Sequence, residues 1–147
     1  MKLGTIQISL GVVGGALTWI FGGWDLLLQY LILFMVLDYV TGLIKAGFNK
    51  EISYKVGFVG LAKKVGILAI VAVAHGLDQL FASETSNIFG LEFPVIRTIV
   101  IWGYLINESI SILENIKLLG VPLPPVLQKI LSIIKEDVNS KSNSIKE

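Results

Sequence analysis

The chain has 147 residues, of which 54% are hydrophobic and 16% are charged, and its 12 Lys and Arg nearly balance its 11 Asp and Glu. This composition excludes a disordered chain, which needs low hydrophobicity and high charge, and it gives no basic field for binding nucleic acid. The lack of cysteine and the single histidine, His75, exclude disulfides, thiolate metal sites and multi-histidine metal sites. We therefore expect one small domain in a lipid bilayer, without a metal or cofactor.

Four long apolar segments dominate the chain. A helix needs about 20 mostly apolar residues to cross the hydrocarbon of a bilayer. The segments of this kind cover residues 3–21, 26–44, 65–82 and 95–113. The last is the weakest candidate because it contains Arg97 and Glu108, and ionisable groups inside a span are expensive. A soluble helical bundle is the alternative, but the second and third segments have long stretches without the polar face of a soluble helix.

The lysines between these segments indicate how the chain is oriented. The linker 45–64 contains five lysines, the linker 83–94 contains no Lys or Arg, and the residues after 113 contain five lysines. Because basic residues concentrate on the cytoplasmic side, this alternation predicts four spans with both termini in the cytoplasm. Arg97 lies near the outer side, and we expect it to snorkel to the interface. A cleaved signal peptide is the alternative for the first segment, but no A-x-A-like site follows it.

The C-terminal region, residues 116–138, predicts a proline elbow followed by an amphipathic helix. Gly120 is typical of the residue that ends a helix, and Pro124 and Pro125 can begin the next one. From Val126 onward the apolar residues recur at helical spacing, but the segment is too short and too polar to span. We expect it to lie on the cytoplasmic membrane face or to pack on another protomer. Residues 139–147 are polar, and we expect a disordered tail.

Polar residues share a face in three of the four segments. Asp38 aligns with Thr41 and Lys45 in the second segment. Lys64, His75 and Asp78 align along the third, and the fourth carries Arg97, Tyr104, Glu108, Ser111 and Asn115 on one face. Such stripes either line water or hold the helices of one chain together through hydrogen bonds. The residues that we assign to a pore-lining or interface-lining stripe are Asp38, Lys64, His75, Asp78, Arg97, Glu108, Glu114 and Asn115.

Small residues predict close helix packing. Gly11 and Gly15 form a small-xxx-small pair in the first segment, and Gly66 adds a small residue to the third. An enzyme is not expected, because the chain has no nucleophile at a strained turn, no oxyanion-hole loop and no phosphate-binding loop.

Several strings of residues resemble the toxin-secretion/phage-lysis holin family. These are DYVTG at residues 38–42, then Ser53, Gly57 and Lys63-Lys64, and above all NESISILEN at 107–115 followed by LGVPLP at 119–124. The similarity extends from about residue 26 to about residue 131. It implies a bacteriophage or prophage protein of the bacterial cytoplasmic membrane that forms homo-oligomers and opens holes. A peptidoglycan-degrading endolysin, or a toxin in related systems, would leave the cytoplasm through them.

The resemblance and the residues together predict an all-α integral membrane protein, with about four transmembrane helices in residues 1–115 and an amphipathic interfacial helix. Members of the family are often described with three spans, so segment 3–21 would be an additional one. Two other functions stay open at this stage. The stripes also fit a small ion channel or transporter subunit with a narrow pore, and a scaffold for other membrane proteins would need no pore.

Overall fold

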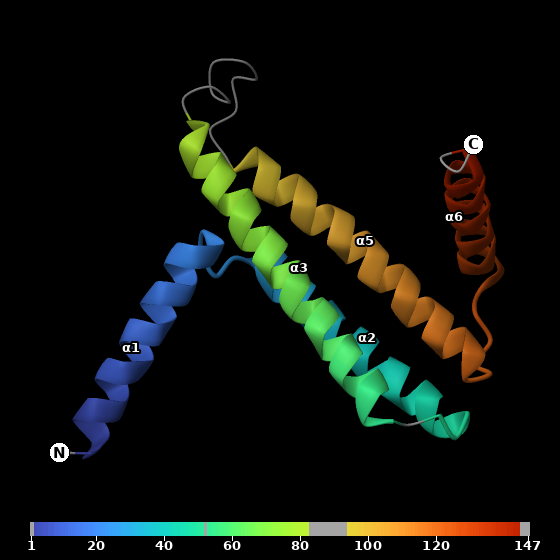
Figure 1. Cartoon of the computed structure of the whole chain (residues 1–147), viewed down its shortest axis with the longest axis horizontal. Helices are drawn as coiled ribbons and strands as arrows, with labels where there is room; N and C mark the ends of the chain where they lie inside the picture. The colour runs from blue at the N-terminus through green and yellow to red at the C-terminus, as the bar shows by residue number, and fades with distance from the viewer. Residues whose placement is uncertain (1, 52, 83–93, 145–147) are drawn as a thin grey trace.

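The computed structural model describes residues 2–51, 53–82 and 94–144, and these residues form helices without any strand. The helices are α1 (Lys2–Phe21), α2 (Leu26–Phe48), α3 (Tyr54–Leu80), α5 (Val95–Leu118) and α6 (Pro125–Ser144). Helices α2, α3 and α5 lie side by side as a bundle, in which α5 packs against both α2 and α3. Helix α1 diverges from this bundle, and α6 stands apart beyond the end of α5 (Figure 1). The expected all-helical fold is confirmed in the described residues.

Three helices in the described residues are long and apolar enough to cross a membrane. They comprise Leu26–Phe48, Gly57–Leu80 and Val95–Leu118. The first apolar segment does form helix α1, but within the residues searched it contributes only the shorter apolar stretch Gly11–Phe21. Three of the four expected spans are therefore supported, and the fourth stays a prediction.

The helices of the bundle extend beyond the expected spans. Helix α2 ends at Phe48 instead of 44, α5 ends at Leu118 instead of 113, and α3 already begins at Tyr54. Residues 45–64 were expected to be a basic linker between two spans. This linker is mainly helix, because lysine is a good helix former and backbone hydrogen bonding continues past the apolar residues. Helix α6 likewise continues to Ser144, six residues past its expected end at 138.

The ends of the helices follow local sequence rules. The side chain of Asp25 caps α2 by accepting a hydrogen bond from the backbone N–H of Leu28 at 2.9 Å. At the end of α5, Gly120 has a positive φ of 84°. The N–H groups of Gly120 and Val121 donate to the carbonyls of Lys117 and Ile116, which is the pairing of a Schellman motif. The elbow expected from Gly120 and the prolines is thus present, and α6 begins at Pro125.

The core of the bundle is a belt of apolar side chains between polar groups. Its buried members are Leu28, Leu31, Met35, Ile67, Val71, Ile101 and Leu105. On each helix these residues are three or four positions apart, so they form one inward stripe. Outside the belt, large apolar side chains such as Leu33, Val73 and Trp102 are exposed on the single chain. A soluble protein of this size would not leave so much apolar surface open, whereas lipid tails would cover it.

Candidate functional site

Two polar clusters lie at opposite ends of the apolar belt. The lysine cluster consists of Asp38, Thr41, Lys45, Lys64, Glu108 and Asn115. The arginine cluster consists of Asp25, Asp78 and Arg97. Along α3, Lys64 and Asp78 are 14 residues apart, which corresponds to about 21 Å of helix. The separation between Arg97 and Glu108 on α5 corresponds to about 17 Å. Both distances are shorter than the hydrocarbon layer of about 30 Å, so the two clusters cannot both lie outside this layer on its opposite sides.

Lys64 is the centre of the lysine cluster. Its Nζ lies 2.6 Å from Oδ2 of Asp38 on α2, and it also forms an ion pair with Oε2 of Glu108 on α5. The exposed fraction is 13% for the Lys64 side chain, 15% for Asp38 and 2% for Glu108. One ammonium group therefore connects carboxylates from two other helices in a mostly dry environment.

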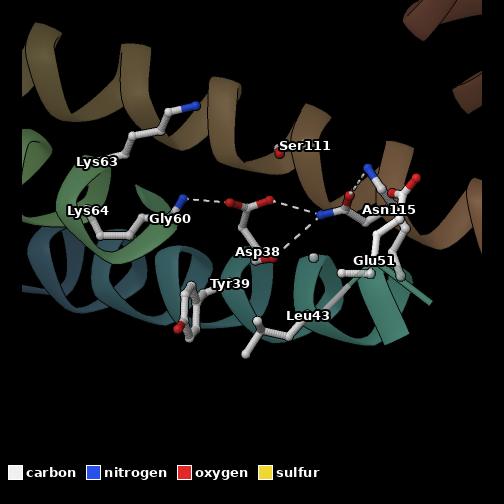
Figure 2. A pocket seen from close by; sticks show the side chains of 12 residues that line it. Asp38, Tyr39, Leu43, Glu51, Gly60, Lys63, Lys64, Ser111 and Asn115 are labelled. Atoms are coloured by element: carbon white, nitrogen blue, oxygen red, sulfur yellow. Dashed lines mark hydrogen bonds and ion pairs between the residues drawn. The ribbon is translucent and has the colours of Figure 1, made fainter. Parts of the chain in front are cut away.

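Asn115 extends this cluster towards the end of α5. Its Nδ2 donates to Oδ1 of Asp38 and to Oγ1 of Thr41, both at 3.2 Å. Its Oδ1 accepts a hydrogen bond from Nζ of Lys45 at 3.4 Å. Figure 2 shows the contacts that run from Lys64 through Asp38 to Asn115. The hydrogen bond from Lys45 to Asn115 continues this chain. The polar faces expected on the second and fourth segments thus meet each other.

The arginine cluster joins the start of α2, the end of α3 and the start of α5, at the end of the bundle opposite the lysine cluster. Nη1 of Arg97 lies 2.7 Å from Oδ2 of Asp25, and Nη2 lies 3.2 Å from Oδ1. Such a two-bond pair is a strong form of ion pair. The expectation that Arg97 snorkels outward is wrong, because its side chain is 1% exposed while that of Asp25 is 47% exposed. The arginine stays inside because a carboxylate is available at the start of α2.

Asp78 on α3 provides the cap that α5 lacks in its own sequence. The residue before α5, Pro94, forms no side-chain cap. The two carboxylate oxygens of Asp78 instead accept hydrogen bonds from the backbone N–H groups of Ile96 at 2.9 Å and Arg97 at 2.7 Å. Unpaired N–H groups at the start of a helix carry partial positive charge. Asp78 therefore stabilises the helix start and fixes α3 against α5.

Asp25 is a residue of the arginine cluster that the sequence analysis did not identify. An Asp directly before an apolar helix is the usual N-cap signal, and this signal was available. Hydrogen bonding by Arg97 is the largest cause that lowers the pKa of Asp25 below its ordinary value of 3.8, and the backbone N–H of Leu28 adds to it, while burial opposes both. Asp25 is thus held in its charged form.

The other expected site residues lie outside these bonds. His75 packs against the turn after α1, where a Cβ on Gly22 would lie 2.4 Å from its Nδ1. Glu114 is half-buried near the end of α5. A Cβ added at Gly11, Gly15 or Gly66 would meet nothing within 4 Å. These three glycines have open faces in the single chain, so their role in helix packing stays a prediction.

The chemistry of the site is that of paired charges. In the part of the chain that the structure describes, no group of three His, Asp or Glu side chains could hold a metal ion. The charged side chains of the two clusters make contacts with opposite charges, amides or backbone N–H groups. Such an arrangement can hold helices together or, if the helices separate, present hydrophilic groups to water.

Comparison with known proteins identifies the family of the chain. The model of the bacteriophage holin family matches residues 15–136. An uncharacterised protein of Clostridium perfringens strain 13 is 41% identical over 140 residues, which cover 94% of this chain and 95% of the relative. An uncharacterised protein of Listeria monocytogenes is 40% identical over 130 residues, covering 87% of this chain and 86% of the relative.

A phage relative is also found. A probable holin of Bacillus phage phi105 is 30% identical over 115 residues, which cover 78% of each chain. No solved structure matches. The family match extends over most of the chain and includes α2, α3 and α5 completely. The chain is therefore a member of the bacteriophage holin family.

Proposed function

We propose that this protein is a phage holin that assembles into homo-oligomers in the bacterial cytoplasmic membrane. The assemblies form holes that release an endolysin, or a toxin in related systems, and so cause lysis of the host. Both termini lie in the cytoplasm, and α1 is a fourth span. Membership of the family and three span-length helices support this assignment.

The apolar belt is the observation that carries the proposal for assembly. It separates the lysine cluster from the arginine cluster, so the bundle of α2, α3 and α5 has a dry centre. Three or four packed helices cannot enclose a hole wide enough for a folded enzyme. Release of such an enzyme therefore requires many copies that surround a common opening.

The polar stripes supply the faces that such an assembly needs. In the single chain Asp38, Asp78 and Glu108 are largely buried and paired, which reduces the cost of placing them in lipid. In the assembly Asp38, Asp78 and Glu108 turn towards water, where hydration replaces the pairing. The open glycine faces at Gly11 and Gly15 then serve as lateral contacts between copies.

The test is expression in a bacterium with and without an endolysin that lacks its own export signal. Membrane potential and culture density are followed through time. A holin gives sudden lysis only when the endolysin is present. A narrow ion channel, the alternative function, would collapse the potential but keep a folded reporter enzyme inside the cell, and a scaffold would change neither.

Variants test the water-facing role of the stripes. Glu108→Leu and Asp78→Leu should insert but alter the time of lysis, because each removes a hydrophilic group from the proposed hole. Asn107→Leu is the matched control, since Asn107 neighbours Glu108 but is exposed on the outer side of the bundle. Lysis on time by Glu108→Leu and Asp78→Leu would refute the water-facing assignment.

A further inference from the structure

Helix α6 carries an apolar row that the rest of the chain leaves open. Val126, Ile130 and Ile133 are three or four residues apart, so they lie along one side of the helix. Their exposed fractions are 69%, 45% and 54%, whereas Leu131 beside them is buried. The exposed Ser132 lies on the opposite side, about 200° around the helix from Ile130. A helix with one apolar and one polar side suits a boundary between an apolar medium and water.

Hydrogen bonds within the elbow connect α6 to the end of α5. Beyond the Schellman motif at Gly120, the Nε2 group of Gln128 donates to the carbonyl of Leu123 at 2.7 Å. The backbone N–H of Gln128 donates to the carbonyl of Pro124 at 3.2 Å, and the side chain of Leu123 is buried. Helix α6 therefore follows α5 through a structured turn, and Figure 1 shows it apart from the bundle of α2, α3 and α5.

The length of α5 brings this exposed row to the surface of a bilayer. Its 24 residues correspond to about 36 Å, which exceeds the hydrocarbon layer of about 30 Å. When α5 spans the bilayer, Leu118 thus reaches the head groups. The six residues 119–124 can extend by no more than about 20 Å. Because Leu118 and Val121 are also exposed, open apolar side chains continue from α5 through the elbow onto α6.

We propose that α6 binds the cytoplasmic leaflet as an interfacial helix. The exposed row lies at the boundary between head groups and acyl chains, and the side with Ser132 faces the cytoplasm. The exposed Lys117 and Lys129 add attraction for anionic head groups. This contact fixes the cytoplasmic end of α5, the helix that supplies Glu108 to the lysine cluster. The side of the membrane rests on the proposed function, whereas the interfacial position does not depend on the formation of holes.

The position of α6 is measured by fluorescence quenching on the full chain in vesicles of phosphatidylcholine and phosphatidylglycerol. Because the chain has no cysteine, a nitrobenzoxadiazole label can be attached at a single introduced one. Ile130→Cys labels the exposed row, and Ser132→Cys is the matched control on the opposite side. The quenchers are nitroxide lipids and iodide, with iodide on both sides of the membrane.

At position 130 we expect blue-shifted emission, loss of iodide quenching and strong quenching by nitroxide lipids. The nitroxide near the head group should quench most, since an interfacial helix lies about 5–10 Å deep. At position 132 iodide should quench. Equal iodide quenching at both positions would overturn the proposal. Protection of position 130 from both quenchers would show that protein covers it, from this chain or another copy, and would overturn the bilayer as the partner.

A charge in the exposed row tests the same contact. With the label at position 130, Ile133→Glu should weaken quenching by nitroxide lipids and restore quenching by iodide. Ser132→Glu is the control and should leave both unchanged, because its side chain points away from the membrane. Unchanged quenching in Ile133→Glu would refute the apolar contact. None of these measurements uses lysis, so they are independent of the test of the proposed function.

Discussion

Replacement of Lys64 by glutamine tests whether the lysine cluster holds the three helices together. Lys64→Gln keeps a side chain of similar length but removes the charge that faces Asp38 and Glu108. Two carboxylates from α2 and α5 then remain in the interior without their cation. We expect the helices to separate more easily, and the loss to be much larger than for a surface lysine.

The size of the loss follows from the surroundings of the two carboxylates. Removal of one partner from a buried ion pair costs about 3–5 kcal/mol, because the remaining charge is left without compensation. Asp38 keeps the hydrogen bonds from Asn115, so the larger share comes from Glu108, which is 2% exposed. We therefore expect the free energy of unfolding to fall by about 3–5 kcal/mol in Lys64→Gln.

A second substitution separates charge balance from packing. In Lys64→Gln with Glu108→Gln, the most buried carboxylate becomes a neutral amide that can bond with the new glutamine. Neutral hydrogen bonds contribute about 0.5–1.5 kcal/mol each, so this double variant should recover most of the lost stability. Lys55→Gln is the control, because Lys55 is an exposed lysine of the same helix and its replacement should stay within about 0.5 kcal/mol.

The measurement is unfolding of the purified protein in mixed micelles by increasing dodecyl sulfate, followed by circular dichroism. A loss in Lys64→Gln no greater than that in Lys55→Gln would show that the ion pairs do not hold the bundle. A double variant as unstable as the single one would show that packing, and not the uncompensated charge, causes the loss. The double variant is also informative in cells, since it should insert but lack the charge of Glu108, one of the groups proposed to face water.

Three further outcomes are expected. Asp25→Asn keeps a capping side chain but loses the charge that faces Arg97, so the wild type should be more stable than the variant at neutral pH. Because the pKa of Asp25 lies below 3.8 in the folded chain, this difference in stability should be present above pH 3.8 and disappear as the pH falls through the folded-state pKa. A difference that persisted at lower pH would contradict the ion pair. In Gly22→Ala, the turn after α1 would need an alanine at a φ of 76°, and its Cβ would clash with the imidazole of His75. Thermal unfolding in micelles should therefore show that the free energy of unfolding falls by about 1–3 kcal/mol. Gly15→Ala is the control, because Gly15 lies in a helix with no neighbouring atom near the added Cβ, and it should not destabilise the protein. Deletion of residues 1–22 should change the time of lysis in culture, and unchanged timing would exclude a regulatory role for this helix.

The sequence predicts much of the bundle because its signals are local. Apolar stretches of span length, the glycine at position 120 and the proline at 125 each determine the conformation of neighbouring residues. The helical spacing also places Asp38, Lys64 and Glu108 on the polar faces of their helices. These features require only the periodicity of a helix, and no knowledge of how the helices lie against each other.

The pairing between helices could not be predicted in this way, because it depends on their relative height and rotation. Lys64 meets Glu108 across 44 positions in the sequence, and Arg97 meets Asp25 across 72. Helical periodicity predicts on which face of its helix a residue lies, but not which residue of another helix it contacts. The snorkelling prediction for Arg97 failed for this reason, since the sequence does not show that Asp25 is a carboxylate at the same end of the bundle.

The positions of the two clusters connect stability in lipid with the proposed assembly. Each cluster pairs its charges across different helices, so separation of the helices breaks the pairs and leaves the charged groups to be hydrated. In lipid this hydration is not available, and the bundle stays closed. Where many copies meet around a water-filled opening, hydration compensates for the broken pairs. If the proposed assembly forms, the same residues favour the closed chain in lipid and the open chain around water, and the substitutions at Lys64 and Glu108 should affect both states together.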